Sequence, residues 1–185
     1  MLIPVLVTAP ASEPLTVAEA KAHLRVDQAD EDALITALVA AARQYVEERC
    51  WCSVQAQTWK LLLNDWPHEP LRLPKGPATG ITSVRYQTGI NTWVTLASDQ
   101  YTLLQDGRWW LAYDMQWPTT ALYGWEPVEI TYTAGVGAST ALRQAMLLLI
   151  GHWYENREAV VVTPGVTAVK VPLAVDSLLY LYELR

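Results

Sequence analysis

The chain has 185 residues, about half of them hydrophobic, which suits one domain or one domain that carries an insertion. Its formal net charge is −6 at pH 7. This acidic balance argues against a protein whose main task is to grip nucleic acid phosphates, because that affinity comes from lysine and arginine. No apolar run reaches the length of about 18 residues that a membrane-spanning helix needs, so we expect no membrane partner.

The N-terminal part, residues 1–52, predicts an extended arm followed by two helices. The first helix is short, and its start is marked by Thr16, a residue type that is favoured at the N-cap. Glu19 follows three residues later and completes the spacing of a capping box. We expect this helix to end near Leu24 and the second to be capped by Asp27 or Asp30.

The second helix has two distinct faces. Apolar side chains recur on one side at helical spacing and predict a core face: Leu34, Ile35, Leu38, Val39, Ala42, Tyr45 and Val46. Small side chains on another side would let a second helix approach closely, which makes them a candidate subunit interface: Ala33, Ala37, Ala40 and Gln44. Alternatively, alanine is simply the best helix former on a solvated surface, and both interpretations stay open.

The middle block, residues 53–137, changes to the pattern of short β-strands. Its segments are rich in β-branched and aromatic residues and are separated by Gly, Pro, Asn and Asp. The expected strands are 55–63, 71–73, 81–87, 92–96, 101–104, 108–112 and 128–135. Because the connections are short, we expect hairpins and therefore an antiparallel meander.

Tryptophan is concentrated in this block, at Trp93, Trp109, Trp110, Trp117 and Trp125. Core packing is the ordinary explanation for most of these side chains. Aromatic side chains that share one surface can also form a platform for a ligand, so the alternative function is a module that binds a ligand such as a carbohydrate.

A third helix is expected to begin near Ser139 or Thr140, since "GVGAS" at 135–139 is typical of a turn from a strand into a helix. The stretch from Leu142 to Tyr154 is apolar around most of the helix circumference. A helix of this kind is buried between layers.

A connector of 12 residues, 160–171, follows the third helix, and Pro172 then suits the first position of a last helix. An amphipathic helix after a connector is a natural docking element. The candidate docking side of this helix comprises Val175, Leu178, Leu179, Leu181 and Tyr182.

These elements predict the α+β class. The expected architecture is a helical bundle, formed by the N-terminal helix pair and the C-terminal helices, with an antiparallel β insertion in the middle. The expected division is a helical core from residues 1–52 and 138–185 and an insertion from residues 53–137.

The sequence carries no phosphate-binding loop, dinucleotide fingerprint or nucleophile elbow. His152 and Glu155 have a spacing that could contribute two metal ligands, but a usable site needs at least a third. We therefore predict no catalytic, metal or cofactor site and expect an interaction protein rather than an enzyme. A small enzyme with an unrecognised site and a nucleic-acid-binding packaging accessory stay as further alternatives.

Two stretches resemble the head–tail connector family of tailed phages, whose members are also called adaptor or head-completion proteins. The first is "PLTVAEAKAHLRVDQADEDALITALVAAARQYVEERC", with matching residues Leu15, Thr16, Glu19, Ala20, Lys21, Leu24, Arg25, Asp32, Ile35, Ala41, Ala42, Arg43 and Glu47. The second is "LRQAMLLLIGHWYENREAV", with matching residues Ala145, Leu149, Tyr154, Asn156, Arg157 and Glu158. The long β block resembles the longer branch of the family, found in prophages and gene transfer agents.

The resemblance implies a structural protein in the neck of a virion or phage-like particle, made in the bacterial cytoplasm. It implies a ring of about twelve copies beneath the portal that extends the DNA channel and joins head to tail. The implied partners are other copies of the chain, the portal protein and the next neck or tail-completion protein. With a portal implied, the docking side of the last helix, between Val175 and Tyr182, becomes the candidate portal-docking side. DNA only passes through the channel, and no cofactor is implied.

Overall fold

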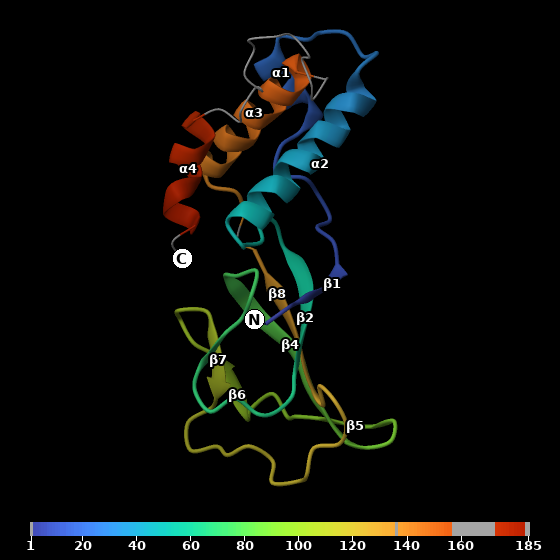
Figure 1. The fold of residues 1–185 in the computed structure, drawn as a ribbon, viewed down its shortest axis with the longest axis vertical. Helices are drawn as coiled ribbons and strands as arrows, with labels where there is room; N and C mark the ends of the chain where they lie inside the picture. The colour runs from blue at the N-terminus through green and yellow to red at the C-terminus, as the bar shows by residue number, and fades with distance from the viewer. Residues whose placement is uncertain (1, 136, 157–172, 184–185) are drawn as a thin grey trace, which may run out of the picture. The chain divides into compact units, whose positions relative to one another are not determined.

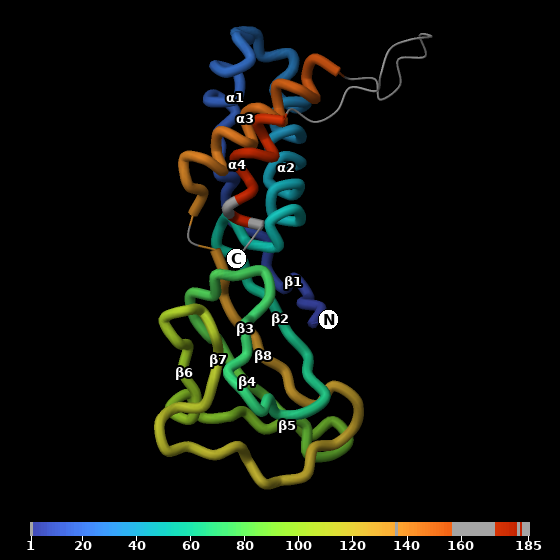
Figure 2. Tube along the Cα trace, turned by 60° about the vertical axis from the view of Figure 1, so that its left-hand side comes forward, coloured from blue at the N-terminus to red at the C-terminus, as the bar shows by residue number. Residues whose placement is uncertain are grey.

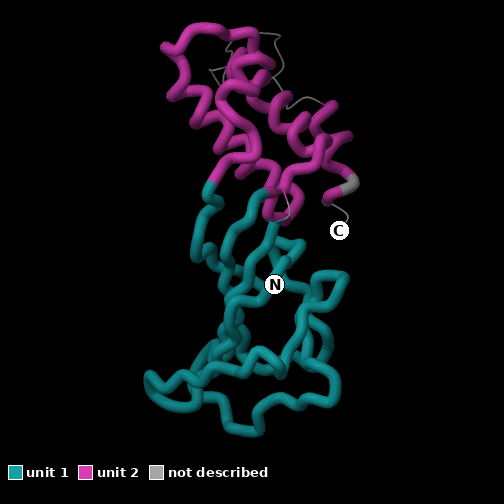
Figure 3. The backbone as a smooth tube through the Cα atoms, turned by 180° about the vertical axis from the view of Figure 1, so that it is seen from behind, with its two compact units in different colours: residues 1–11, 55–136 teal, residues 12–54, 137–185 magenta. Residues whose placement is uncertain are grey.

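The computed structural model describes residues 2–135, 137–156 and 173–183 of the chain, apart from the side chains of Leu181 and Glu183 (Figure 1). The predicted connector at 160–171 and Pro172 lie outside the described residues. The chain divides into a β unit, residues 1–11 and 55–136, and a helical unit, residues 12–54 and 137–185 (Figure 3). The predicted α+β class is confirmed.

The β unit contains two antiparallel sheets. In the five-stranded sheet the order is β1 (Val5–Thr8), β2 (Gln57–Leu63), β8 (Val128–Ala134), β4 (Ala78–Gly89) and β5 (Thr92–Thr95). In the three-stranded sheet it is β3 (Leu71–Arg72), β7 (Arg108–Leu111) and β6 (Tyr101–Leu103). Figure 2 shows the smaller sheet beside β4.

All seven strands expected from the sequence are present, but their order is not that of a meander. The last strand, β8, lies between β2 and β4 and pairs with both. The physical reason is burial: Val128, Ile130 and Tyr132 are fully buried, and a strand this apolar is most stable at the centre of a sheet. Among the described strands, consecutive ones pair in three cases: β1–β2, β4–β5 and β6–β7.

The N-terminal arm differs from the prediction. We expected an extended arm belonging to the helical part of 1–52, but Val5–Thr8 forms strand β1 and pairs with β2. Residues 1–11 therefore belong with the β unit. Main-chain hydrogen bonding explains the difference, because a paired strand satisfies backbone groups that a free arm leaves to water.

Aromatic side chains fill much of the space inside the β unit. Trp109 is fully buried, and Trp117 stacks on Trp66 with 4.8 Å between ring centroids and lies 5.1 Å from the Trp109 ring. The buried Tyr132 hydroxyl donates a hydrogen bond to the Pro74 carbonyl at 2.7 Å, and burial raises the pKa of Tyr132. Core packing thus accounts for most of the tryptophan side chains in this block.

The helical unit has four helices: α1 (Val17–Leu24), α2 (Asp32–Arg49), α3 (Thr140–Glu155) and α4 (Leu173–Glu183). The predicted start and end of α1 are confirmed. The Glu19 amide donates to the Thr16 hydroxyl oxygen at 3.2 Å, and the Thr16 amide donates to the Glu19 carboxylate at 2.8 Å. This second bond does most to hold the pKa of Glu19 below its usual value.

The predicted cap of α2 is wrong. The helix begins after Glu31, whose side chain makes no capping hydrogen bond, and neither Asp27 nor Asp30 is the cap. A backbone turn takes over part of that role, since the Asp32 amide donates to the Ala29 carbonyl at 3.1 Å. The Asp32 carboxylate adds negative charge to the first turn, where it suits the helix dipole.

The core face predicted for α2 is largely confirmed. Ile35, Val39, Ala42 and Val46 are buried, whereas Leu34 is 37% exposed. They pack against α3, which begins after the Ser139 cap and buries five side chains along its length: Leu142, Ala145, Met146, Leu149 and Ile150. One apolar core thus joins the helices.

Trp109→Ala is predicted to destabilise the β unit by about 3–5 kcal/mol, because it removes a fully buried ring. Trp125 is 91% exposed, so Trp125→Ala is the matched control and should change stability by no more than about 0.5 kcal/mol. Urea denaturation followed by far-ultraviolet circular dichroism measures both. Equal effects of the two substitutions would contradict this account of the core.

Candidate assembly surface

The predicted interface residues lie on the side of α2 that points away from the core. Ala33, Ala37 and Gln44 are exposed and Ala40 is half-buried. They share one face because their spacing follows the helical repeat. The helical unit thus offers a smooth surface without a charged side chain among these four positions, which a neighbouring helix could approach closely.

Arg43 and Glu47 are charged residues of α2 that the fold nevertheless buries. They are only 8% and 7% exposed. Arg43 Nη1 lies 2.7 Å from Glu47 Oε2, and Arg43 Nε lies 2.7 Å from Glu13 Oε2. Glu47 also accepts a hydrogen bond from the Val54 amide at 2.9 Å. The one sequence signal for this pair is its i, i+4 spacing.

The charges of this network stabilise one another. Burial alone would lower the pKa of Arg43, but the two carboxylates outweigh burial and raise its pKa above the usual value. The guanidinium therefore holds the segment before α1, through Glu13, against α2. The side of α2 that carries Ala33, Ala37 and Gln44 takes no part in these contacts and is exposed.

A second arginine fixes the same N-terminal segment from α3. Arg143 donates to the Pro14 carbonyl and to the Glu19 carboxylate. Lys21 on α1 forms an ion pair with Asp32 on α2, at 2.7 Å. The position of α2 within the helical unit is thus set by polar contacts as well as by its apolar core.

The predicted portal-docking side of α4 packs within its own chain. Val175 and Leu179 are fully buried, and Leu178 and Tyr182 pack against the same core. The Tyr182 hydroxyl lies 2.6 Å from the Ser139 hydroxyl at the start of α3. The fifth predicted residue, Leu181, has a side chain outside the described part. In this arrangement Val175 and Leu179 are not available to a partner, because the α3 core already covers them.

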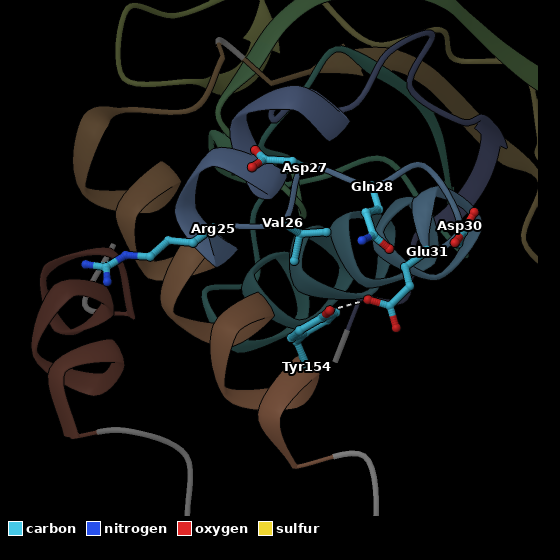
Figure 4. Close-up of a pocket in the computed structure, with 7 residues that line it drawn as sticks. All are labelled: Arg25, Val26, Asp27, Gln28, Asp30, Glu31 and Tyr154. Atoms are coloured by element: carbon cyan, nitrogen blue, oxygen red, sulfur yellow. Dashed lines mark hydrogen bonds between the residues drawn. The ribbon is translucent and has the colours of Figure 1, made fainter.

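A shallow hollow lies where the loop between α1 and α2 meets the end of α3 (Figure 4). Its volume is ≈ 530 Å³, and its lining comprises Arg25, Val26, Asp27, Gln28, Asp30, Glu31 and Tyr154. The Tyr154 hydroxyl donates to the Glu31 carboxylate. Within the described residues, no three His, Cys, Asp or Glu side chains are placed to hold a metal ion. The hollow therefore suggests no particular chemistry.

The β unit offers little support for the alternative function as a ligand platform. Trp109 is fully buried, Trp110 and Trp117 are half-buried, and the Trp93 ring is covered on one side by Arg85, 5.5 Å away. Of these tryptophans only Trp125 stands clear in solvent, so the tryptophans by themselves form no platform.

The comparisons with known proteins decide the class of this chain. The family model of the head completion protein matches residues 13–172. The chain belongs to the head completion protein family. A search of curated proteins finds no match.

Solved structures of particle necks show the same fold. A chain in the neck of an empty GTA particle, computed with C6 symmetry, is 26% identical with a TM-score of 0.74, covering 97% of this chain and 94% of that one. A chain in the virion of a native gene transfer agent (GTA) particle is 27% identical with a TM-score of 0.70 and the same coverage. A chain in the neck of a native GTA particle, computed with C12 symmetry, is 28% identical with a TM-score of 0.66, covering 98% and 94%.

These matches confirm the predicted class of function, a head–tail connector protein of the neck of a phage-like particle. They also confirm the resemblance to the branch found in gene transfer agents. The role of the family is structural rather than enzymatic. Among the described residues, no helix is both long and apolar enough to cross a membrane.

Glu47→Ala is predicted to destabilise the helical unit by about 3–5 kcal/mol, because it leaves the buried Arg43 charge with one carboxylate and removes the acceptor of the Val54 amide. Gln44→Ala, on the exposed face of the same helix, is the control and should change the free energy of unfolding by no more than about 0.5 kcal/mol. Urea denaturation of both variants tests this. A Glu47→Ala protein as stable as the control would show that the network adds nothing.

Proposed function

We propose that copies of this chain form a ring of about twelve beneath the portal of a phage-like particle, extending the DNA channel and offering a surface to the next protein of the neck. The observation that supports this best is the similarity to neck chains along nearly the whole length, 97% of this chain at a TM-score of 0.74. Those necks were computed with C6 and C12 symmetry.

The proposed seam between neighbours includes the outward face of α2. In a closed ring each copy uses two different surfaces, one toward each neighbour. Ala33, Ala37 and Gln44 are exposed opposite the core, so a neighbouring helix could pack here without disturbing the fold. The short alanine side chains permit a close approach of two helix backbones.

The charge of the chain suits a DNA channel through which DNA slides. Surfaces with a net charge of −6 per copy repel phosphates, whereas a grip on DNA needs clusters of lysine and arginine. Within the helical unit the densest group of carboxylates lies in the loop before α2 and at its first residue: Asp27, Asp30, Glu31 and Asp32. We propose contact with DNA only in passing.

For the portal contact we propose the outward side of α4. Since Val175 and Leu179 are buried in the chain's own core, a docking role falls to the apolar side chains that α4 leaves exposed. Leu173 is 83% exposed and Tyr180 is 59% exposed. These two side chains supply an apolar anchor and an amphipathic aromatic, a combination that suits protein interfaces.

The experiment that tests the ring is electron microscopy of the purified chain mixed with the portal protein of its own particle. A ring of this chain stacked on the portal is the expected result. A chain that never binds the portal, in pull-down or in microscopy, would overturn the proposal.

Ala37→Arg and Ala40→Arg are each predicted to leave the helical unit folded and to stop ring assembly, because a long charged side chain would occupy the seam. Ala37→Ser and Ala40→Ser keep the side chains small and serve as controls that should assemble. Circular dichroism checks folding, and microscopy with the portal checks assembly. Normal rings from both arginine variants would show that this face is only a solvated helix surface.

A further inference from the structure

The two edges of the five-stranded sheet are unusual because neither carries a charge. β1 and β5 are the outermost strands, and every residue of both is exposed. The chain has no charged residue from Leu2 to Ser12, nor from Tyr86 to Ser98. Natural sheets usually protect such edges with lysine or other charges, since an open edge presents unpaired N–H and C=O groups to any passing strand.

Apolar side chains line the β1 edge on both faces of the sheet. Val5 is 48% exposed, Leu6 46% and Val7 53%. Pro4 and Pro10 bracket the strand, and because proline cannot donate to a ladder, they confine pairing to the few residues between them. β5, with the sequence TWVT, has the same length of 4 residues and a similar content of β-branched and aromatic residues. Two short, uncharged edges of equal length are thus available on opposite sides of one sheet.

We infer that β1 of one copy pairs with β5 of the next copy, so that the sheets of neighbouring subunits join around the ring. This inference rests on the proposed ring. A head-to-tail contact needs two different and complementary surfaces on each copy, and the two opposite edges of one sheet provide them. Pairing would also satisfy the open main-chain groups of both strands at once.

The symmetry of a ring fixes the direction of this pairing. Strands β1 and β5 run the same way, because four successive antiparallel pairings separate them in the sheet order. Neighbours in a ring of about twelve differ in orientation by only about 30°. By the order of the pairings, β5 of one copy and β1 of the next would thus form a ladder of the parallel kind, with the twist of about 20–25° per strand adding up across the sheet.

The register of the sheet says which side chains share a face across the joint. Partners in a ladder point to the same face. Leu6 pairs with Trp59 and Val94 pairs with Tyr86, and both partners lie on the core face of the sheet. Thr95 pairs with Arg85 and so points to the opposite face. Leu6 and Val94 of neighbouring copies thus share a face, whereas Leu6 and Thr95 do not.

The test is disulfide trapping between copies assembled on the portal. The variant carrying both Leu6→Cys and Val94→Cys should, under mild oxidation, change from monomer to a ladder of multimers on non-reducing gels. Adjacent strands bring Cα atoms to roughly 5 Å, within disulfide range. Val5→Cys with Thr95→Cys, on the opposite face of the sheet, is a second pair in case the first fails to fold.

The controls separate the possible results. Leu6→Cys with Thr95→Cys, each single variant, and the unmodified chain with its native Cys50 and Cys52 should all stay monomeric. Rings that assemble normally without a ladder from either matched pair would overturn the β1–β5 joint and leave the proposed ring intact. Dimers from Leu6→Cys alone would also overturn it, since they show two β1 strands pairing with each other. Failure of the unmodified chain to form any ring would remove both proposals.

Discussion

The buried guanidinium of Arg43 is the constraint on which the helical unit depends. It contacts Glu13 in the segment before α1 and Glu47 one turn further along α2, and Glu47 in turn holds the Val54 amide. Glu13 lies near one end of the N-terminal part of this unit, and Val54 lies at the other. A single charge cluster therefore anchors both ends of that part of the chain. Removing one partner would leave a buried charge without full compensation, so each of Arg43, Glu13 and Glu47 depends on the other two.

This network decides which side of α2 is open. The apolar stripe of α2 packs on the core, and the buried ion pair lies beside that stripe. One side of the helix therefore remains exposed. That side carries Ala33, Ala37 and Gln44. Polar contacts from α1 and α3 fix the helix further, through Lys21 and Arg143. A rigid, smooth face requires little reordering when a neighbour packs against it, and side-chain ordering is one of the costs of association.

Local patterns predicted local structure well and long-range structure poorly. The capping box at Thr16 and the apolar repeat from Ile35 to Val46 depend on residues close in the sequence, and both appear as expected. The strand order does not depend on such neighbours. β8 pairs with strands that lie far from it in the chain, so the hairpin rule, which considers only loop length, gave a meander. Burial of Arg43 was likewise invisible, because one of its carboxylates is 30 residues away.

The candidate assembly surface shows the same contrast between local features, which the sequence predicted, and long-range contacts, which it did not. The alanine face of α2 followed from helical spacing alone, and its exposure agrees with that geometry. The apolar side of α4 was assigned to a partner because an amphipathic helix after a connector has no visible mate in the sequence, yet α3 covers Val175 and Leu179. Strand β1 was overlooked as an edge, although the uncharged run from Leu2 to Ser12 was a usable signal. Composition indicates that a segment avoids charge, but only the strand pairing shows that the segment lies at the edge of a sheet.

Charge offers a reason why the proposed seams are neutral. About twelve copies of a chain with net charge −6 bring together about 70 negative charges, and such self-repulsion opposes a compact assembly. Salt screens charges separated by more than about 10 Å at 0.1 M, so the repulsion that matters is between groups at the contact itself. Ala33, Ala37, Ala40 and Gln44 on α2 and the edges β1 and β5 carry no charged side chain, and the exposed Glu48 lies one turn beyond Gln44 at the end of the proposed seam. Neighbours that meet there would avoid the short-range repulsion, while the carboxylates elsewhere stay hydrated.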